Sequence, residues 1–192
     1  MSAAHDTPGV AFELDGQPVT AHPGETILKA AQRHGVEIPH LCYTDGLRPD
    51  GNCRACVVEI AGERTLAPSC CRAPTEGMKV LATSPRARKS QQMVVEMLLS
   101  DMPDQGYRWN DGGANTPELI AENIDPSGGK GLFDSKNSGT IGQHGELSAW
   151  ADRLGVTVRP ALQALRREQP APDLSHPAMA VNLDACIQCN RC

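Results

Sequence analysis

The sequence predicts an α+β fold, in which a sheet of four or five short strands packs against one helix and further helices follow. Short apolar runs on either side of Asp15-Gly16 indicate a β-hairpin, because this dipeptide forms tight turns between paired strands. Residues 26–35 then carry apolar side chains at helical spacing. Three more short apolar runs follow between positions 57 and 82, which completes the strands needed for a small sheet.

The sheet and its helix are expected in a β-grasp arrangement. The helix over residues 26–35 ends at Gly35, because glycine readily adopts the left-handed conformation found after helix C-termini. Gly62 marks the turn of a second hairpin. The expected strands are Val10–Leu14, Gln17–Ala21, Val57–Ile60, Thr65–Ala67 and Lys79–Ala82.

A longer helix is expected after the sheet. It starts at Ser84-Pro85, with serine as the N-cap and proline in the first turn, and it ends at Pro103. We expect this helix to pack on the preceding domain through an apolar stripe of Val94, Met97 and Leu98, with Met93 alongside.

The rest of the chain is poorer in regular structure. Residues 107–145 are rich in Gly, Asn, Asp and Ser and predict a long surface insertion, with one short helix at 116–123. Two short helices are expected at 146–154 and 159–168, followed by an extended, Pro-rich connector over 169–177.

These patterns divide the chain into four parts. Residues 1–83 form the sheet domain, and residues 84–103 form the packing helix. Residues 104–177 hold the loop-rich insertion, the short helices and the connector, and residues 178–192 form a cysteine-rich end.

Five of the eight cysteines lie in one Gly-rich stretch between residues 38 and 78. The gaps between the first four are ten, two and thirteen residues, so a Cys-x2-Cys pair has one cysteine upstream and one downstream. Plant-type [2Fe–2S] sites also combine a Cys-x2-Cys pair with an upstream and a distant cysteine, which favours iron–sulfur chemistry. Structural zinc remains the alternative, because all-cysteine zinc sites use the same pair. The five cysteines are Cys42, Cys53, Cys56, Cys70 and Cys71.

The last residues carry a second group, Cys186, Cys189 and Cys192, in the pattern Cys-x2-Cys-x2-Cys. This pattern opens the bacterial ferredoxin run, in which the cysteine that follows serves another cluster. The three thiolates predict three ligands of a [4Fe–4S] cluster whose fourth ligand lies outside the chain. We therefore expect the 192 residues to be the front of a longer polypeptide.

Composition excludes several classes of function. A net charge of −5 and an aromatic content of 3% argue against nucleic-acid binding, which needs basic patches and stacking side chains. The chain has no apolar run of roughly 18 residues, so no membrane helix is expected. The N-terminus lacks the basic and apolar regions of a secretory signal, and the cysteines cluster in metal-binding patterns. We expect a cytoplasmic protein.

Three segments, IPHLCY, GNCRACVVE and SCC followed by GM, resemble the [2Fe–2S] domain that opens the large subunit of respiratory complex I. The same domain opens iron-only hydrogenases and the catalytic subunit of NAD-dependent molybdenum or tungsten formate dehydrogenases. The resemblance implies a ferredoxin-like β-grasp fold for residues 1–83. It also implies that Cys42, Cys53 and Cys56 are ligands of a [2Fe–2S] cluster.

The resemblance leaves the fourth ligand open between Cys70 and Cys71. The family's spacing from this ligand to the Gly77-Met78 pair favours Cys70, whereas its usual proline three residues after the ligand favours Cys71. We expect Cys70 to be the ligand and Cys71 to be a buried second thiol near the cluster.

Complex I and hydrogenase members place a His-x3-Cys-x2-Cys-x5-Cys site directly after the helix that follows this domain. The present chain has no cysteine between Cys71 and Cys186, so it departs from that pattern. The stretches GERTLAPSCCRAP, MVVEMLLSDMPDQG and LSHPAMAVNLDACIQCNRC instead resemble the α subunit of soluble NAD-dependent formate dehydrogenases.

This narrower resemblance implies a relay of electrons. Such enzymes convert formate and NAD⁺ to CO₂ and NADH. They use a molybdenum or tungsten bis-pyranopterin guanine dinucleotide, [4Fe–4S] clusters, a flavin (FMN) and NAD-binding subunit and a small [2Fe–2S] subunit. The pterin site and its catalytic residues are not in these 192 residues. Two alternatives stay open: a redox subunit of another NAD-linked complex of the hydrogenase or complex I type, and a non-redox zinc-binding docking module.

Overall fold

A computed structural model provides the structure of the chain. It describes residues 9–102, 146–168, 170–171, 173–181, 183 and 186–191. The short helix expected at 116–123 lies outside these residues, as does Cys192.

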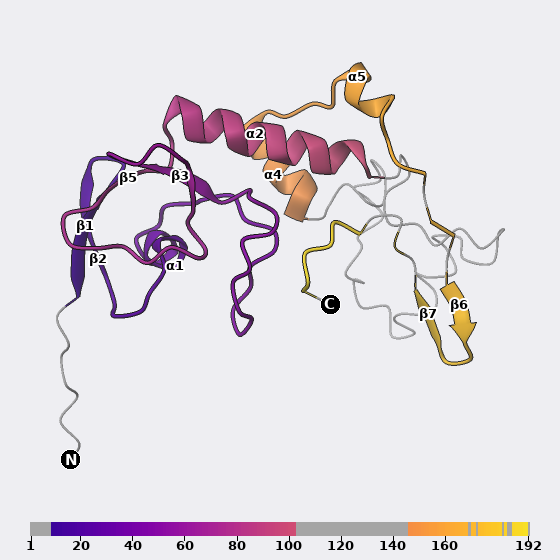
Figure 1. Cartoon of the computed structure of the whole chain (residues 1–192), viewed down its shortest axis with the longest axis horizontal. Coiled ribbons are helices and arrows are strands. Elements are labelled where there is room, and N and C mark those ends of the chain that lie inside the picture. Colours follow the sequence, from indigo (N-terminus) through magenta and orange to yellow (C-terminus); the bar gives the residue numbers. More distant parts are fainter. Residues whose placement is uncertain are drawn as a thin grey trace, which may run out of the picture.

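The N-terminal part is built on a five-stranded mixed sheet with the strand order β2-β1-β5-β3-β4 (Figure 1). The central pair, β1 and β5, is parallel, with Leu14 opposite Val80, and the other neighbours are antiparallel. This sheet confirms the predicted α+β fold. The strands are β1 (Val10–Leu14), β2 (Gln17–Ala21), β3 (Val57–Ile60), β4 (Ala67–Pro68) and β5 (Lys79–Leu81).

Helix α1 (Ile27–Arg33) packs its apolar face into the core of this domain. It begins after Thr26, whose hydroxyl accepts a hydrogen bond from the Lys29 amide at 3.3 Å. It ends at the C-cap His34, and Gly35 follows with φ +75°, as expected for a residue after a helix end. The buried side chains of the helix are Ile27, Leu28, Ala30 and Ala31.

The turn of the first hairpin also fixes the end of the sheet. Asp15 and Gly16 have φ values of +48° and +81°, so the predicted tight turn is present. The Asp15 carboxylate accepts hydrogen bonds from the amides of Ala82 (2.8 Å) and Thr83 (3.2 Å). The turn therefore holds the chain where it leaves β5 for the next helix.

Helix α2 (Pro85–Ser100) begins as predicted, because the Ser84 hydroxyl accepts a hydrogen bond from the Ala87 amide at 3.1 Å. It ends at Ser100, three residues before Pro103. The predicted apolar stripe is wrong for the methionines, since Met93 is 47% and Met97 59% exposed. The buried row that repeats every four residues is Ala87, Gln91 and Val95. Gln91 contacts the sheet and Val95 packs with α4, and the polar glutamine interrupts the apolar pattern that the prediction relied on.

The C-terminal part differs from expectation in two places. Helix α4 (Glu146–Leu154) lies where it was predicted, but α5 (Pro160–Gln163) ends well before residue 168. The Pro-rich stretch contains a strand, β6 (Asp173–His176), which pairs antiparallel with β7 (Met179–Val181). This stretch therefore begins a β-hairpin, whereas its proline content predicted an extended connector.

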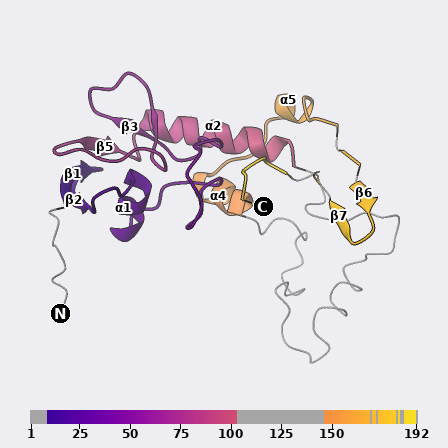
Figure 2. The same ribbon diagram turned by 60° about the horizontal axis from the view of Figure 1, so that its bottom comes forward.

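Helix α2 links the two halves of the structure. It runs alongside β3 at one end and packs against α4 along its length, and both views place the C-terminal residues beside α4 (Figures 1 and 2). Among the described residues, no helix combines the length and apolarity needed to cross a bilayer.

Candidate metal centre

The loop between the first two cysteines is tied to helix α1. The Tyr43 hydroxyl donates a hydrogen bond to Asp45 at 3.2 Å, and Lys29 forms an ion pair with the same carboxylate. The Lys29 ammonium also lies 5.9 Å from the centre of the Tyr43 ring. These exposed contacts fix the path that leaves Cys42.

Ser69 joins the segments that carry Cys56 and Cys70. Its hydroxyl donates a hydrogen bond to the Cys56 carbonyl at 2.7 Å, and its amide donates to the same oxygen at 3.1 Å. All three residues are fully buried. Sequence reasoning missed Ser69; its position directly before a predicted ligand is the signal that could have found it.

The four predicted ligands form two contacting pairs. The Cys53 side chain is hydrogen-bonded with Cys42, and burial raises the pKa of Cys53 to about 11. The Cys56 side chain is hydrogen-bonded with Cys70, which lowers the pKa of Cys56 to about 6 and raises the pKa of Cys70. The contact between the two thiols therefore favours ionisation of Cys56. Thiolate is the form that binds metal.

This division into pairs fits a cluster with two irons. Two tetrahedral irons need eight bonds; two bridging sulfides supply four, which leaves two thiolates for each iron. Zinc in a structural site would instead need four ligands around one ion. The donor set therefore fits a [2Fe–2S] cluster.

Cys71 differs from the prediction because it is exposed, not buried. The chain turns at this point, where the amides of Cys71 and Arg72 both donate to the Pro68 carbonyl at 3.1 Å. Cys70 and Cys71 therefore differ completely in burial, although their sulfurs lie only 3.5 Å apart. Burial favours Cys70 as the fourth ligand.

Gly51 allows the cysteine loop to pass close to Cys71. Its φ is +66°, and a Cβ atom at this position would lie 3.0 Å from the Cys71 sulfur. A residue with a side chain would be strained there by both backbone conformation and contact.

The second cysteine group packs against the first. Ile187, beside Cys186, belongs to the apolar cluster that contains Leu41, Ala55 and Val95, and the Cys53 side chain also packs there. The Arg191 guanidinium donates a hydrogen bond at 2.9 Å to the carbonyl of Leu41, the residue before Cys42. Segments about 150 residues apart in sequence therefore meet at this point.

Hydrogen bonds shape the second group locally. The Gln188 amide donates a hydrogen bond to the Cys186 sulfur at 3.3 Å. Arg167 donates to the carbonyls of Cys186 (3.1 Å) and Leu183 (3.3 Å). Cys189 is half-buried, and Cys192 lies outside the described residues.

Helix α4 contacts the segments that carry both cysteine groups. The sequence did not predict these contacts. Near the first group, Trp150 lies against His40 with ring centres 6.2 Å apart. Near the second, Glu146 forms an ion pair with Arg191. Arg153 extends the contact by pairing with Glu37 at 3.0 Å.

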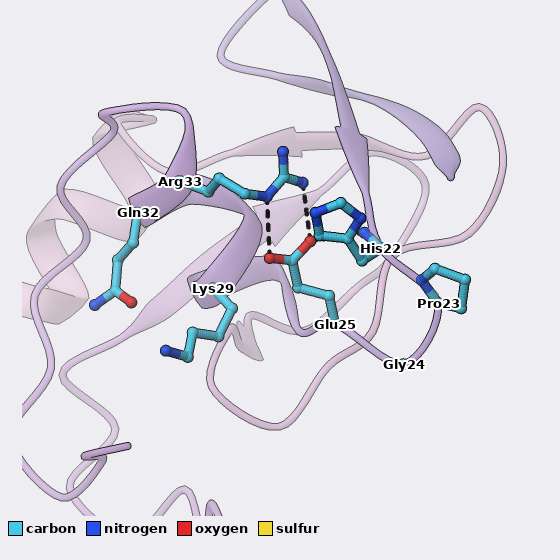
Figure 3. Close-up of a pocket in the computed structure, with 7 residues that line it drawn as sticks. All are labelled: His22, Pro23, Gly24, Glu25, Lys29, Gln32 and Arg33. Carbon is cyan, nitrogen blue, oxygen red and sulfur yellow. Dashed lines mark hydrogen bonds and ion pairs between the residues drawn. The ribbon is translucent and has the colours of Figure 1, made fainter. Parts of the chain in front are cut away.

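A surface hollow of about 610 Å³ lies at the start of α1, and no cysteine lines it. In this hollow the Arg33 guanidinium donates hydrogen bonds to the Glu25 carboxylate at 2.9 and 3.3 Å (Figure 3). The hollow is therefore separate from the cysteines. It is lined by His22, Pro23, Gly24, Glu25, Lys29, Gln32 and Arg33.

Comparison with known proteins places the first cysteine group in a defined domain. Residues 7–85 match the family described as "2Fe-2S iron-sulfur cluster binding domain". Over 94 residues the chain is 39% identical to the mitochondrial NADH-ubiquinone oxidoreductase 78 kDa subunit of Candida albicans, a match that covers 49% of this chain and 13% of that protein. Residues 7–85 are thus a [2Fe–2S] cluster-binding domain, as the sequence predicted.

Two further relatives extend beyond this domain. NADP-reducing hydrogenase subunit HndD of Solidesulfovibrio fructosivorans is 30% identical over 184 residues, 93% of this chain and 26% of that protein. The crystal structure of an NAD⁺-reducing [NiFe]-hydrogenase in the H₂-reduced state is similar, with a TM-score of 0.63 and 26% identity. The match covers 95% of this chain and 64% of that chain. The present chain spans 13% and 26% of the two curated relatives.

Proposed function

We propose that this chain is the iron–sulfur electron-transfer portion of an NAD-linked oxidoreductase complex, and more narrowly of an NAD-dependent formate dehydrogenase. In this proposal Cys42, Cys53, Cys56 and Cys70 hold a [2Fe–2S] cluster. Cys186, Cys189 and Cys192 supply three ligands of a [4Fe–4S] cluster, whose fourth ligand lies outside the chain.

The observation that carries the proposal is the contact between the two cysteine groups. Leu41 precedes the first predicted ligand, and it both packs with Ile187 and accepts a hydrogen bond from Arg191. Electron transfer between two centres requires that they lie close together. A docking module would have no need to bring two separate thiol groups onto one apolar cluster.

The protein's own contribution is to hold and desolvate the ligands. When bound, a plant-type [2Fe–2S] cluster carries one electron at about −400 mV, which suits exchange with nicotinamide cofactors. Ser69 fixes the segments of Cys56 and Cys70, and burial of these thiols limits water around the site. Such hydrogen bonding and burial are the means by which proteins tune cluster potentials.

The narrower assignment rests on sequence. No cysteine lies between Cys71 and Cys186, and the segments around both groups resemble formate dehydrogenase α subunits. In that assignment a flavin and NAD-binding subunit and a small [2Fe–2S] subunit are the partners. The molybdenum or tungsten pterin centre lies in polypeptide beyond these residues. The clustering of the cysteines as metal-binding motifs supports a reducing cytoplasm as the compartment.

A subunit of an NAD-linked hydrogenase is the second candidate. It is favoured by the similarity to the two hydrogenase proteins, which covers nearly the whole chain. Reduction of NAD⁺ by the assembled complex distinguishes the two, because formate drives it in one case and H₂ in the other.

The first test is the metal content of the chain purified without air. We expect a complement of about two irons and two acid-labile sulfides for the first site, with a rhombic S = ½ EPR signal after dithionite reduction. The Cys42→Ala variant should lose that signal. Stoichiometric zinc without sulfide would contradict the proposal and leave the docking module.

A further inference from the structure

The chain has one more thiol at the [2Fe–2S] site than four bonds to iron require. Cys70 and Cys71 are adjacent in sequence, and their sulfurs lie 3.5 Å apart. Cys70 is fully buried and contacts Cys56, whereas Cys71 is exposed and is hydrogen-bonded only weakly, at 3.6 Å, with the Pro49 carbonyl. The predicted site therefore has a buried sulfur, that of Cys70, and an exposed sulfur, that of Cys71, side by side.

We propose that Cys71 is a reserve ligand, which binds iron when the Cys70 thiolate is not available. This inference rests on the proposed [2Fe–2S] function. It assigns a metal-binding role to a thiol that the four-ligand set leaves unused.

The exchange needs no oxidant or reductant. With a cluster bound, the Cys71 thiolate would replace the Cys70 thiolate on the same iron, one iron–sulfur bond being broken as the other is formed. The proton of the Cys71 thiol would move to the released Cys70 thiolate, so charge and electrons balance. The short distance between the two sulfurs allows this proton to pass directly.

The surroundings of Cys71 are consistent with such a movement. Its side chain lies at the surface, where the sulfur is hydrogen-bonded with the Pro49 carbonyl at 3.6 Å. Pro49 belongs to the loop between Cys42 and Cys53, so Cys71 already contacts the chain that encloses the predicted site. Cys71 also lies on the turn after Pro68, directly beside the buried Cys70.

The test compares four forms of the whole chain, purified without air: the wild type, Cys71→Ala, Cys70→Ala and the double Cys70→Ala/Cys71→Ala variant. Alanine is used because a serine hydroxyl can itself bind iron. Iron, acid-labile sulfide and the EPR signal report the cluster. Alkylation by iodoacetamide, mapped by mass spectrometry of the peptide over residues 65–72, reports whether each thiol is bound.

We expect the wild type and Cys71→Ala to hold the cluster equally, and Cys71 in the wild type to be alkylated without loss of iron. Cys70→Ala should retain at least about fivefold more iron and sulfide at the first site than the double variant, which lacks a fourth thiolate. Its EPR signal should be shifted from that of the wild type, and Cys71 should now resist alkylation.

Loss of the cluster in Cys70→Ala to the level of the double variant, in a folded protein, would overturn the inference. The proposed function would still stand in that case, because the wild type would keep its cluster. Zinc in the wild type would instead refute the function itself. If far-UV circular dichroism shows that Cys70→Ala does not fold, Cys70→Val restores side-chain bulk without a group that binds iron. A folded Cys70→Val protein in which Cys71 is alkylated, and which holds no more iron than the double variant, would then overturn the inference.

Discussion

Gln91 is the polar residue on which the contact between α2 and the sheet depends. It is 2% exposed, and its side-chain amide donates hydrogen bonds to the carbonyls of Val57 (2.9 Å) and Ala82 (3.3 Å). Val57 directly follows the predicted ligand Cys56. Replacing Gln91 with leucine keeps the approximate size of the side chain but removes both donors.

The expected loss of stability follows from these contacts. A buried carbonyl that loses its donor costs about 1–3 kcal/mol, and two are affected here. The buried leucine returns about 1.5–3 kcal/mol of apolar transfer energy. The net loss is therefore about 2 kcal/mol, which corresponds to a fall in Tm of roughly 4–8 °C for a protein of this size.

The assay is thermal unfolding of the chain followed by far-UV circular dichroism under anaerobic conditions. Gln163→Leu serves as the matched control, because Gln163 is exposed on α5 and the same substitution should change stability by less than about 0.5 kcal/mol. Equal Tm values for Gln91→Leu and Gln163→Leu would refute the assignment of a structural role to the Gln91 hydrogen bonds.

Two further predictions concern the loop and the second half of the structure. Gly51→Ala should lower Tm more than Gly46→Ala, because both residues have positive φ but only Gly51 approaches the Cys71 sulfur (3.0 Å); adding Cys71→Ala should remove the excess. The Arg159 guanidinium holds the pKa of Glu96 below its ordinary 4.5, so this carboxylate stabilises the fold above that pH and ceases to do so as pH falls through the lowered pKa. The Tm of Glu96→Gln should therefore vary less with pH below about 4.5 than that of the wild type, and parallel curves would contradict this origin.

Local patterns in the sequence were sufficient for the first hairpin but not for the whole sheet, since the strand expected at Thr65–Ala67 is β4 (Ala67–Pro68) in the structure. The Asp15-Gly16 turn and the strands beside it depend on neighbouring residues, and their bounds match the structure. The buried face of α2 depends on distant residues instead. Gln91 is buried because the carbonyls of β3 and of the end of β5 need donors, and no hydrophobicity pattern records that need.

The candidate site likewise has some features that follow from the local sequence and others that depend on distant residues. The sequence predicted one site for the first cysteine group, because its members lie on one short stretch of chain, but it did not predict which of the thiols contact one another. The exposure of Cys71 was not predictable, because it depends on the turn made by Pro68 and Arg72. The role of Arg191 was likewise hidden, since its partner Leu41 lies about 150 residues away.

The long-range contacts have a common chemical form that bears on function. Arg167 and Arg191 both donate to backbone carbonyls of cysteine-bearing segments, at Cys186 and at Leu41. A guanidinium has several N–H donors in a rigid plane, so it can bond a carbonyl and a second partner at once. Arg191 does so by bonding the Leu41 carbonyl while it pairs with Glu146. Because these contacts join residues 19 and 150 positions apart, the two arginines hold the cysteine-bearing segments in fixed places, as the proposed electron relay requires.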